Sequence, residues 1–294
     1  MGGARVLLGE VQGVEGLKVS VIIPCVKRDE LFDRCVRSIE RSVGAARGCD
    51  VEHELVVVEG VSPVGAARNE GLRRATGDWI AWVDADDEVE EAWFPEICRA
   101  LVRANAPGSE IDDIVFDMTS VTPTRETVCA YGRDGLVDGP TMRDDLLRDI
   151  RLGSYSWLHV TSRRLWADER FEEIAAMEDY VTLPRVLGRA RRILPVPRPL
   201  YRYIARPGSL TTGDRQEEIV RTIYRRGEEY GGCAVIGTSL GAYNFLYNRE
   251  DRDGSARRWI RRHLVCALLD RELTPKWKLK LVLAAAGVII RRPK

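Results

Sequence analysis

Residues 65–87, GAARNEGLRRATGDWIAWVDADD, indicate the fold class of the chain. Residues 66–75 have helical spacing and are followed by Gly77, which is typical of a helix C-terminus. The next run, Trp79 to Val83, is short and wholly apolar, which favours a strand buried on both faces of a parallel sheet. Three carboxylates follow that run directly, on Asp84, Asp86 and Asp87. The block therefore predicts a helix, a buried strand and an acidic cluster where the strand ends.

Apolar runs and helical spacing alternate on both sides of this block. The further apolar runs are Lys18–Pro24, Glu54–Val58 and Ile111–Met118, and helical segments lie at Asp29–Arg47 and Glu91–Ala104. A regular alternation of strands and helices is typical of an open parallel sheet flanked by helices. The chain is therefore predicted to be an α/β protein with a mostly parallel sheet.

Beyond Met118 the pattern is looser. We expect a strand at Val128–Tyr131, helices at Thr141–Arg151, Ser162–Asp168 and Ala176–Leu187, and an extended stretch at Pro195–Tyr203. From Glu217 onwards the pattern is helical, with a break near Thr274-Pro275. The expected organisation is an irregular lead-in at residues 1–17, an α/β domain at 18–215 and a helical C-terminal region at 216–294.

The charge of the chain is unevenly spread, although its formal net value is zero. From Arg252 to the C-terminus there are 12 Lys/Arg against 3 Asp/Glu. A basic end on an acidic body indicates an anionic partner, although a solvated helical face would have the same composition. No nucleic-acid-binding motif accompanies the charge, so we predict no nucleic acid partner. Residues 273–294 combine a tryptophan with basic residues and only ten consecutive apolar residues, which suits an anionic membrane surface but is too short for a span.

The cysteines predict a reducing compartment. There are seven of them, an odd number, and no two lie at a metal-ligand spacing. We therefore expect reduced thiols and neither a zinc site nor a disulfide. The N-terminus lacks the charged-then-apolar pattern of a secretion signal. Together these features predict a cytoplasmic protein, with the inner face of the membrane as an alternative location.

The acidic cluster has the chemistry of a metal site. Alternation along an extended chain places Asp84 and Asp86 on one side and Ala85 on the other. Mg²⁺ and Mn²⁺ prefer oxygen ligands and are commonly held by one or two carboxylates together with substrate phosphates. Acidic residues after a strand could instead cap the next helix or solvate a turn. The distinctive strand and the Thr76-Gly-Asp-Trp79 turn before it favour the metal site.

Three segments resemble the family 2 glycosyltransferases, which have a GT-A type fold. VSVIIP at 19–24 and ELVVVEG at 54–60 resemble the first two strands of that family, and residues 65–87 resemble its metal-binding block. The resemblance implies inverting transfer of a sugar from a nucleoside-diphosphate sugar, most often a UDP-sugar, to an acceptor hydroxyl, with Mn²⁺ or Mg²⁺. It further implies a saccharide or lipid-linked saccharide as acceptor, in the synthesis of cell-surface polysaccharide.

The resemblance also implies roles for individual residues. On the donor side these are Asp86 as the main metal ligand, Asp84 facing the ribose or the metal, Asp87 in support, Pro24 and Glu59 at the nucleoside, Arg68 at the donor pocket and Arg206 at the diphosphate. On the acceptor side, Asp179 matches the general base and Glu178 is its neighbour. The structural alternatives are a solvated helix position for Arg68, helix N-terminal acids at 178–179, and a plain turn around Arg206. Trp157 could stack on a sugar or belong to the core.

The chain departs from the family pattern in two ways. It has Glu59-Gly-Val-Ser62 where the family usually has Asp-Asp-Gly-Ser or Asp-Gly-Gly-Ser. It also lacks the helix–strand unit that usually follows, because Ser62 to Gly65 leads straight into the Ala-Arg-Asn segment. A sheet shortened in this way has an open edge, which the N-terminal segment, the basic tail or a second subunit of a homodimer could cover.

Two other functions fit parts of the sequence. A nucleotidyltransferase that makes the activated sugar would need a glycine-rich basic loop after the first strand, but Cys25-Val-Lys-Arg28 has no glycine. A non-catalytic protein that binds a sugar nucleotide or a partner is favoured by the altered Glu59 loop. The intact acidic cluster and the Glu178-Asp179 pair favour the enzyme instead.

Overall fold

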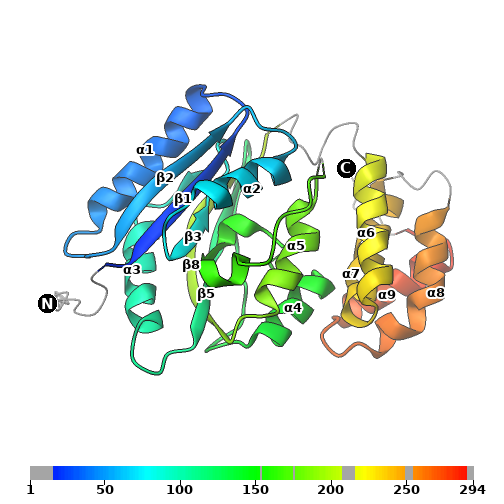
Figure 1. The fold of residues 1–294 in the computed structure, drawn as a ribbon. Coiled ribbons are helices and arrows are strands. Elements are labelled where there is room, and N and C mark those ends of the chain that lie inside the picture. The colour runs from blue at the N-terminus through cyan, green and yellow to red at the C-terminus, as the bar shows by residue number, and fades with distance from the viewer. Residues whose placement is uncertain (1–15, 153, 175, 207–215, 249–253, 290–294) are drawn as a thin grey trace, which may run out of the picture.

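The computed structural model describes residues 16–152, 154–174, 176–206, 216–248 and 254–289. One mixed sheet forms the centre of the body, and a group of helices from the C-terminal part of the chain lies beside it (Figure 1). The strands are β1 (Lys18–Cys25), β2 (Glu52–Glu59), β3 (Trp79–Trp82), β4 (Glu88–Val89), β5 (Ile111–Thr122), β6 (Arg125–Cys129), β7 (His159–Ser162) and β8 (Arg192–Ile204). The helices are α1 (Glu30–Ala45), α2 (Val64–Arg74), α3 (Trp93–Ala104), α4 (Gly139–Arg148), α5 (Glu178–Leu187), α6 (Gln216–Tyr230), α7 (Gly232–Asn248), α8 (Ser255–Leu269) and α9 (Pro275–Ala285).

The sheet runs in the order β2-β1-β3-β7-β5-β8-β4, with β6 paired to β5. β1 is parallel to both β2 and β3, and β5 is parallel to β8, which confirms the predicted mostly parallel α/β sheet. β7 is antiparallel to β3 and β5 and joins the two parallel parts. The prediction of a helix at Ser162–Asp168 was wrong. This part of the chain instead forms the strand His159–Ser162, followed by a single 3-10 turn, Arg163–Trp166.

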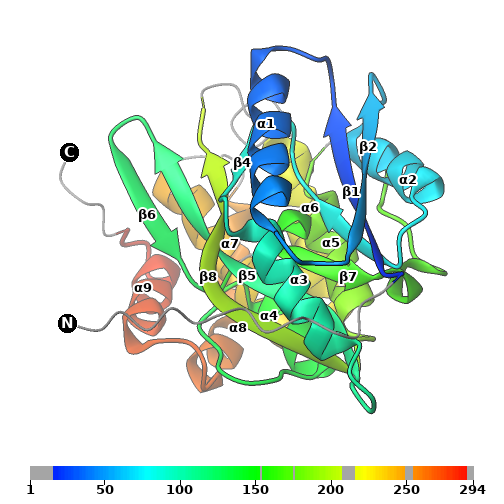
Figure 2. The ribbon, with the colours of Figure 1, turned by 90° about the vertical axis from the view of Figure 1, so that its left-hand side faces the viewer.

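The apolar character of β1 explains its place inside the sheet. Seven of its eight residues are buried, because strands lie on both of its edges and helices cover both faces of the sheet. Figure 2 shows α1 and α3 in front of the sheet and α4 and α5 behind it. α1 begins at Glu30 and is capped by Asp29, whose side chain accepts from the backbone N–H groups of Leu31 and Phe32.

The Thr76-Gly-Asp-Trp79 turn fixes the start of β3 against β1. Asp78 exchanges backbone and side-chain hydrogen bonds with Lys18, at 2.8 and 3.0 Å. A Cβ atom on Gly77 would lie 2.7 Å from the carbonyl oxygen of Lys18, so only glycine allows this close approach. The turn therefore sets the register that brings the ends of β1 and β3 to the same edge of the sheet.

The open edge predicted from the shortened sequence is β2. Only Gly60–Pro63 separates β2 from α2, so no further strand intervenes, and β2 is the last strand of the described sheet on this side. Glu52 and His53 are exposed near its start, and Arg74 donates to the carbonyl oxygen of Val57 at 3.5 Å. Charged side chains on an edge strand oppose pairing with another chain.

The C-terminal helices have a hydrophobic core of their own. It is built mainly from α6, α7, α8 and α9, and it includes Tyr180 of α5. Arg226 of α6 is fully buried, donates to the carbonyl oxygen of Tyr180 at 2.9 Å and lies 3.4 Å from the centre of its ring. This contact ties the helical region to the α/β body. The division at 215/216 stays a prediction, and most of the lead-in (1–17) and residues 290–294 of the tail lie outside the described residues.

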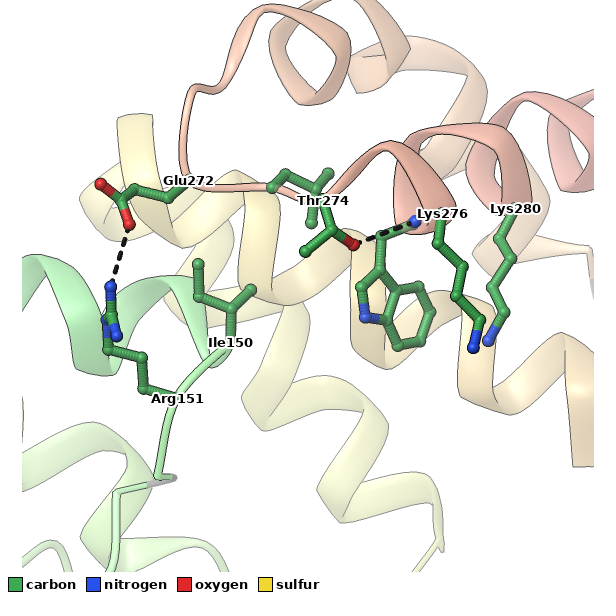
Figure 3. A pocket seen from close by; sticks show the side chains of 8 residues that line it. Ile150, Arg151, Glu272, Thr274, Lys276 and Lys280 are labelled. Atoms are coloured by element: carbon green, nitrogen blue, oxygen red, sulfur yellow. Dashed lines mark hydrogen bonds and ion pairs between the residues drawn. The ribbon is translucent and has the colours of Figure 1, made fainter. Parts of the chain in front are cut away.

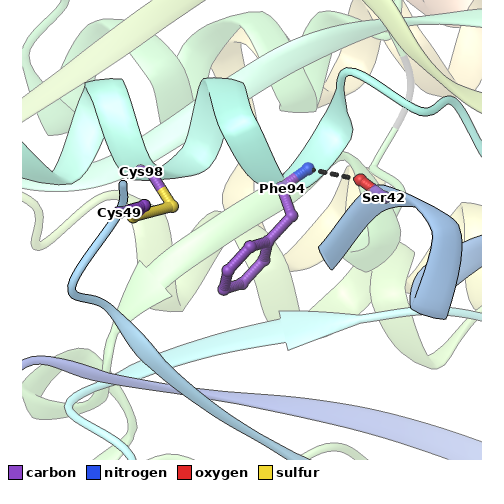
Figure 4. The surroundings of a disulfide bond; sticks show 4 residues. All are labelled: Ser42, Cys49, Phe94 and Cys98. Carbon is purple, nitrogen blue, oxygen red and sulfur yellow. Dashed lines mark hydrogen bonds between the residues drawn. A yellow bond between two sulfur atoms is a disulfide. The ribbon is translucent and has the colours of Figure 1, made fainter. Parts of the chain in front are cut away.

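The cysteine prediction was wrong at one pair. Cys49, after α1, and Cys98, in α3, form a disulfide with a Cα–Cα distance of 6.3 Å (Figure 4). The same two segments are also held by Ser42, whose hydroxyl accepts from the backbone N–H of Phe94 at 2.8 Å. Spacing along the sequence could not identify this pair, because the two cysteines meet only when α1 and α3 pack on one face of the sheet. The cysteine argument for a reducing compartment is therefore lost.

We predict that replacing Cys49 and Cys98 with serine lowers the free energy of unfolding by about 2–4 kcal/mol, since the bond closes a loop with a sequence separation of 49. Thermal denaturation under non-reducing conditions measures the loss. The exposed Cys266→Ser variant is the control and should unfold like the parent protein. Denatured, unreduced protein should offer five thiols to a thiol reagent. Seven reactive thiols would contradict the pairing.

No helix among the described residues is both long enough and apolar enough to cross a membrane.

Candidate active site

The acidic cluster lies where the sheet topology predicts a ligand site. β1, β2 and β3 are parallel, so Cys25, Glu59 and Trp82 end at one edge of the sheet. Asp84 lies two residues beyond β3, and a tight turn joins the backbone N–H of Asp87 to the carbonyl oxygen of Asp84 at 3.0 Å. In open α/β sheets, ligands bind outside the carboxyl ends of the strands. The turn therefore presents its carboxylates at the expected edge.

Arg68 connects this edge to the acidic pair of α5. Its side chain lies on α2 and is 3% exposed. One guanidinium nitrogen donates to Asp179 Oδ1 at 2.6 Å and also pairs with Glu178, and the other donates to Asp84 Oδ1 at 3.0 Å. A buried guanidinium with three carboxylates is not a solvated helix residue, so the structural alternative for Arg68 is excluded. Residues expected on the donor side and the acceptor side thus meet at one side chain.

Asp179 is held from both of its oxygen atoms. While Arg68 takes Oδ1, Oδ2 accepts from the backbone N–H of Ser156 at 2.9 Å and from the hydroxyl of Ser156 at 3.1 Å. These bonds fix the orientation of the carboxylate. A carboxylate has about four acceptor positions, so capacity remains for a further donor such as a substrate hydroxyl.

The segment before α5 is fixed against α2. The side-chain amide of Asn69 donates to the carbonyl oxygen of Phe171 at 3.0 Å and accepts from its N–H at 2.8 Å. A Cβ atom on Gly65 would lie 2.1 Å from the carbonyl oxygen of Glu172, so the helix can approach this segment only with glycine there. The Gly65-Ala-Ala-Arg-Asn69 sequence therefore positions α5 and its two acids as well as Arg68.

Asp87 faces away from the cluster and anchors β8. It is 2% exposed and accepts from the Tyr201 hydroxyl at 2.9 Å and from the backbone N–H of Ile204 at 2.8 Å. The same hydroxyl accepts from the backbone N–H of Asp84 at 3.1 Å. Burial, with the charges of Asp84 and Asp86, raises the pKa of Asp87 well above its ordinary value. These bonds hold the acidic turn against β8, and a supporting role for Asp87 in the site stays a prediction.

The remaining predicted residues lie at the same edge with different exposure. Arg206 forms an ion pair with Asp86, and both side chains are partly exposed. Glu59 is exposed and pairs with Arg28 at 3.1 Å, while Pro24 is buried in β1. Arg206 thus belongs to the cluster and not to an unrelated turn. Ser209 and Thr211 of the segment that follows it lie outside the described residues.

The cluster carries more negative than positive charge. Among the described residues, two cationic side chains form ion pairs with Asp84, Asp86, Glu178 and Asp179, and these are Arg68 and Arg206. Burial raises the pKa of Asp84 to about 6, against the pull of Arg68 and with a further rise from Asp86 and Asp179. A divalent cation would supply the missing charge. The described residues hold no ready-made group of three or more His, Cys, Asp and Glu ligands, so a metal here would need donors beyond the protein, such as phosphate oxygens.

We predict that Asp84→Asn stabilises the ligand-free protein at neutral pH. The folded pKa of Asp84 is raised, so its neutral form is favoured in the fold, and stability is lost as pH rises through about 6. Since 29% of the Asp84 side chain is exposed, we expect only part of the free energy that corresponds to the pKa shift to be gained in stability. The variant should gain on the order of 1 kcal/mol over the parent above pH 6 and nothing below pH 4. Urea denaturation across this range measures it, and a gain that does not depend on pH would contradict the assignment.

Trp157 belongs to the core. Its ring is 3% exposed and stacks between Tyr155 and Tyr201, with ring centres at 4.8 and 4.2 Å. Stacking of this ring on a bound sugar is therefore excluded in this conformation. The ring instead packs on Tyr201, whose hydroxyl accepts from the backbone N–H of Asp84 in the acidic turn.

Sequence reasoning missed two residues of this site. Ser156 was not singled out, because a serine before a short strand carries no local signal. Tyr201 was noted only as part of the extended stretch Pro195–Tyr203, and its partner Asp87 lies 114 positions away. Contacts of this separation depend on the sheet order, which the local pattern does not give.

The chain is similar to known glycosyltransferases. The model of "Glycosyl transferase family 2" matches residues 55–112. The chain is 23% identical to the uncharacterized glycosyltransferase YibD of Escherichia coli K12 over 222 residues, 68% of this chain and 64% of YibD. It is 20% identical to the glycosyltransferase GlyA of Streptococcus pneumoniae over 218 residues, 66% of this chain and 31% of GlyA. The chain therefore spans less than two thirds of the length of these relatives.

A solved structure shares the fold over most of the chain. The 1–349 fragment of Staphylococcus aureus TarS has a TM-score of 0.59 at 13% identity, and the match covers 92% of this chain and 87% of the fragment. The same fragment was solved in complex with UDP-GlcNAc, with a TM-score of 0.59 and 15% identity. At this identity the likeness establishes the fold alone.

Proposed function

We propose that this chain is a family 2 glycosyltransferase, an inverting, metal-dependent enzyme that moves a sugar from a nucleoside-diphosphate sugar to an acceptor hydroxyl. The observation that carries the proposal is the set of bonds at Arg68. This side chain holds Asp84, just beyond β3, together with the α5 pair Glu178 and Asp179. Its two hydrogen-bonded carboxylates, Asp84 and Asp179, lie 16 and 111 positions from Arg68 in the sequence. A transferase needs a donor side and an acceptor side in contact, and Arg68 supports that arrangement.

The proposed base is Asp179. Its carboxylate accepts the proton of the acceptor hydroxyl while the oxygen attacks the anomeric carbon and the diphosphate leaves with the bonding electron pair on the opposite side. Ser156 and Arg68 orient the carboxylate, so no reorganisation is needed as the proton moves. Glu178 shares the cation of Arg68 and adds negative charge beside the base.

The proposed donor site uses the opposite side of the same cluster. Asp86 and Asp84 would hold Mn²⁺ or Mg²⁺, which would supply positive charge for the departing diphosphate. Arg206 pairs with Asp86, and if a cation took its place there, this guanidinium would be available to the diphosphate. Pro24 and Glu59, at the ends of β1 and β2, are proposed to line the nucleoside pocket. UDP-GlcNAc in the TarS fragment favours a UDP-sugar as donor.

The proposed acceptor is a saccharide or a lipid-linked saccharide of a cell-surface polysaccharide. A lipid-linked acceptor suits a chain whose C-terminal region is basic and partly apolar on its surface. We therefore propose that the protein works in the cytoplasm or at the inner face of the membrane. A homodimer could cover the open edge of β2 only if it tolerated the exposed Glu52 and His53 there, and its test is the mass of the protein in solution.

We predict that Asp86→Ala abolishes metal-dependent use of the donor. Release of UDP from a panel of UDP-sugars, with Mn²⁺ or with a chelator, measures the reaction. The parent protein should release UDP only with the metal, and the variant should lose at least about 10²-fold in rate, as expected when a major electrostatic contact of the transition state is removed. The exposed Asp134→Ala is the control and should behave like the parent. Equal rates in Asp86→Ala and the parent would remove the metal-site assignment, and no release from any sugar would favour the non-catalytic alternative.

A further inference from the structure

The turn between α8 and α9 carries an unusual concentration of exposed apolar side chains. Among the described residues, six of the eleven exposed large apolar side chains lie between Val265 and Val288. Val265 and Leu269 near the end of α8 are 68% and 75% exposed, and Leu279 in the second turn of α9 is 56% exposed. Asp270–Thr274 is the short loop that joins the two helices, so Val265 and Leu269 come just before it and Leu279 comes just after it. Exposed large apolar side chains concentrated on one part of a surface are typical of an interaction site.

Cations surround this tip, and its acidic residues are already neutralised. Asp270 pairs with Arg148 at 3.1 Å and Glu272 with Arg151 at 3.1 Å, both on the α/β body. No carboxylate of the described residues forms an ion pair with Lys276, Lys278 or Lys280. The tip therefore presents unpaired positive charge beside exposed leucines.

A groove of about 420 Å³ lies beside these lysines, between α9 and the Ile150-Arg151 loop. Figure 3 shows Lys276 and Lys280 one turn apart on α9, extending in the same direction, with Arg151 and Glu272 at the other end. The Lys280 ammonium lies 4.1 Å from the centre of the Trp277 ring, which packs edge-on against Tyr243. The groove thus combines ammonium donors with an aromatic wall, as at the interface between water and lipid headgroups.

We propose that the α8–α9 tip docks on an anionic bilayer, with the exposed leucines in the acyl boundary and the lysines on lipid phosphates. Apolar insertion and electrostatic attraction together give interfacial binding without a spanning segment. A second copy of the chain is a poorer occupant, because it would bring the same unpaired lysines against each other. Docking goes beyond sugar transfer, and it holds or fails independently of the donor site.

Sedimentation of the full chain with vesicles tests the docking. Vesicles of phosphatidylcholine with phosphatidylglycerol should bind the protein, and phosphatidylcholine alone should bind it far less. Replacing Lys276 and Lys278 with glutamine should weaken partition to the anionic vesicles by roughly 30-fold, because each basic residue near such a surface contributes about fivefold. The matched control replaces Arg37 and Arg41 of α1, which are also exposed, with glutamine and should bind normally.

A second variant separates docking from folding. Leu269→Glu should also detach the protein, whereas Val128→Glu, at a residue of β6 that is 59% exposed, should not. Both variants should bind nucleotide like the parent, since neither lies at the acidic cluster, so a failure of docking is distinguished from a failure of the donor site. Equal binding of the lysine variant and the parent, or equal binding to neutral vesicles, overturns the proposal. A concentration-dependent dimer that Leu269→Glu disrupts would instead assign the tip to a second copy and overturn it as well.

Discussion

Asp179→Asn is expected to slow sugar transfer by roughly 10²–10⁴-fold, the usual contribution of a general base. Asparagine keeps the shape of the side chain but has only one acceptor oxygen, so it can keep the bonds from Ser156 or the bond from Arg68, not both. Arg68 would still pair with Asp84 and Glu178, so the site should stay folded. Asparagine cannot take a proton from the acceptor. Donor affinity should therefore change by less than about twofold, which corresponds to a few tenths of a kcal/mol.

Two measurements on the same preparation separate these effects. Calorimetry gives the Kd of the nucleotide sugar, and single-turnover transfer gives the rate of the chemical step. Asp168→Asn, an exposed acid on the segment before α5, is the control and should show parent values for both. Normal transfer by Asp179→Asn would exclude this residue as the base and direct attention to Glu178, whose carboxylate shares the same arginine.

Arg68→Met is expected to lower the free energy of unfolding by about 3–5 kcal/mol at neutral pH. The substitution keeps an apolar side chain of similar length but leaves Asp84, Glu178 and Asp179 without their shared cation. Removing one partner of a buried ionic cluster costs more than the cluster itself contributes, since the remaining charges stay desolvated. The deficit should shrink as the carboxylates are protonated in acid.

Urea denaturation at several pH values measures the loss. Arg68→Lys retains the charge but cannot reach three carboxylates with a planar fork, so it should lie between the parent and the methionine variant. Arg73→Met is the control on the same helix: its side chain is 71% exposed and pairs only with Glu70, so a loss within about 1 kcal/mol is expected. A loss that small in Arg68→Met would show that the cluster does not depend on this arginine.

The parts of the fold that could be predicted are the buried strands, because a buried strand has a recognisable run of apolar residues. Lys18–Pro24 and Trp79–Val83 are apolar because they become inner strands, and the acids after the second run mark its carboxyl end. The absence of a strand between Glu59 and Arg68 was equally readable, because too few residues stand between them. These features depend on neighbours in the chain.

Other features depend on partners far apart in the sequence and could not be predicted. β7 has only four residues and is a strand because β3 and β5 supply hydrogen bonds on both of its edges. Cys49 and Cys98 come close enough to form a disulfide only after α1 and α3 pack together. The resemblance placed Arg68 at the donor pocket, but its bond to Asp179 follows from the way α2 meets α5.

The central claim is that the acidic cluster is a metal-dependent site for a nucleotide sugar, and calorimetric titration tests it most directly. The purified protein would be titrated with UDP, GDP and their common sugars, with Mn²⁺ and without it. The account predicts binding of one nucleotide class, most readily UDP, only when the metal is present, and loss of that binding in Asp86→Ala. Equal binding without metal, or no binding of any nucleotide, would contradict it.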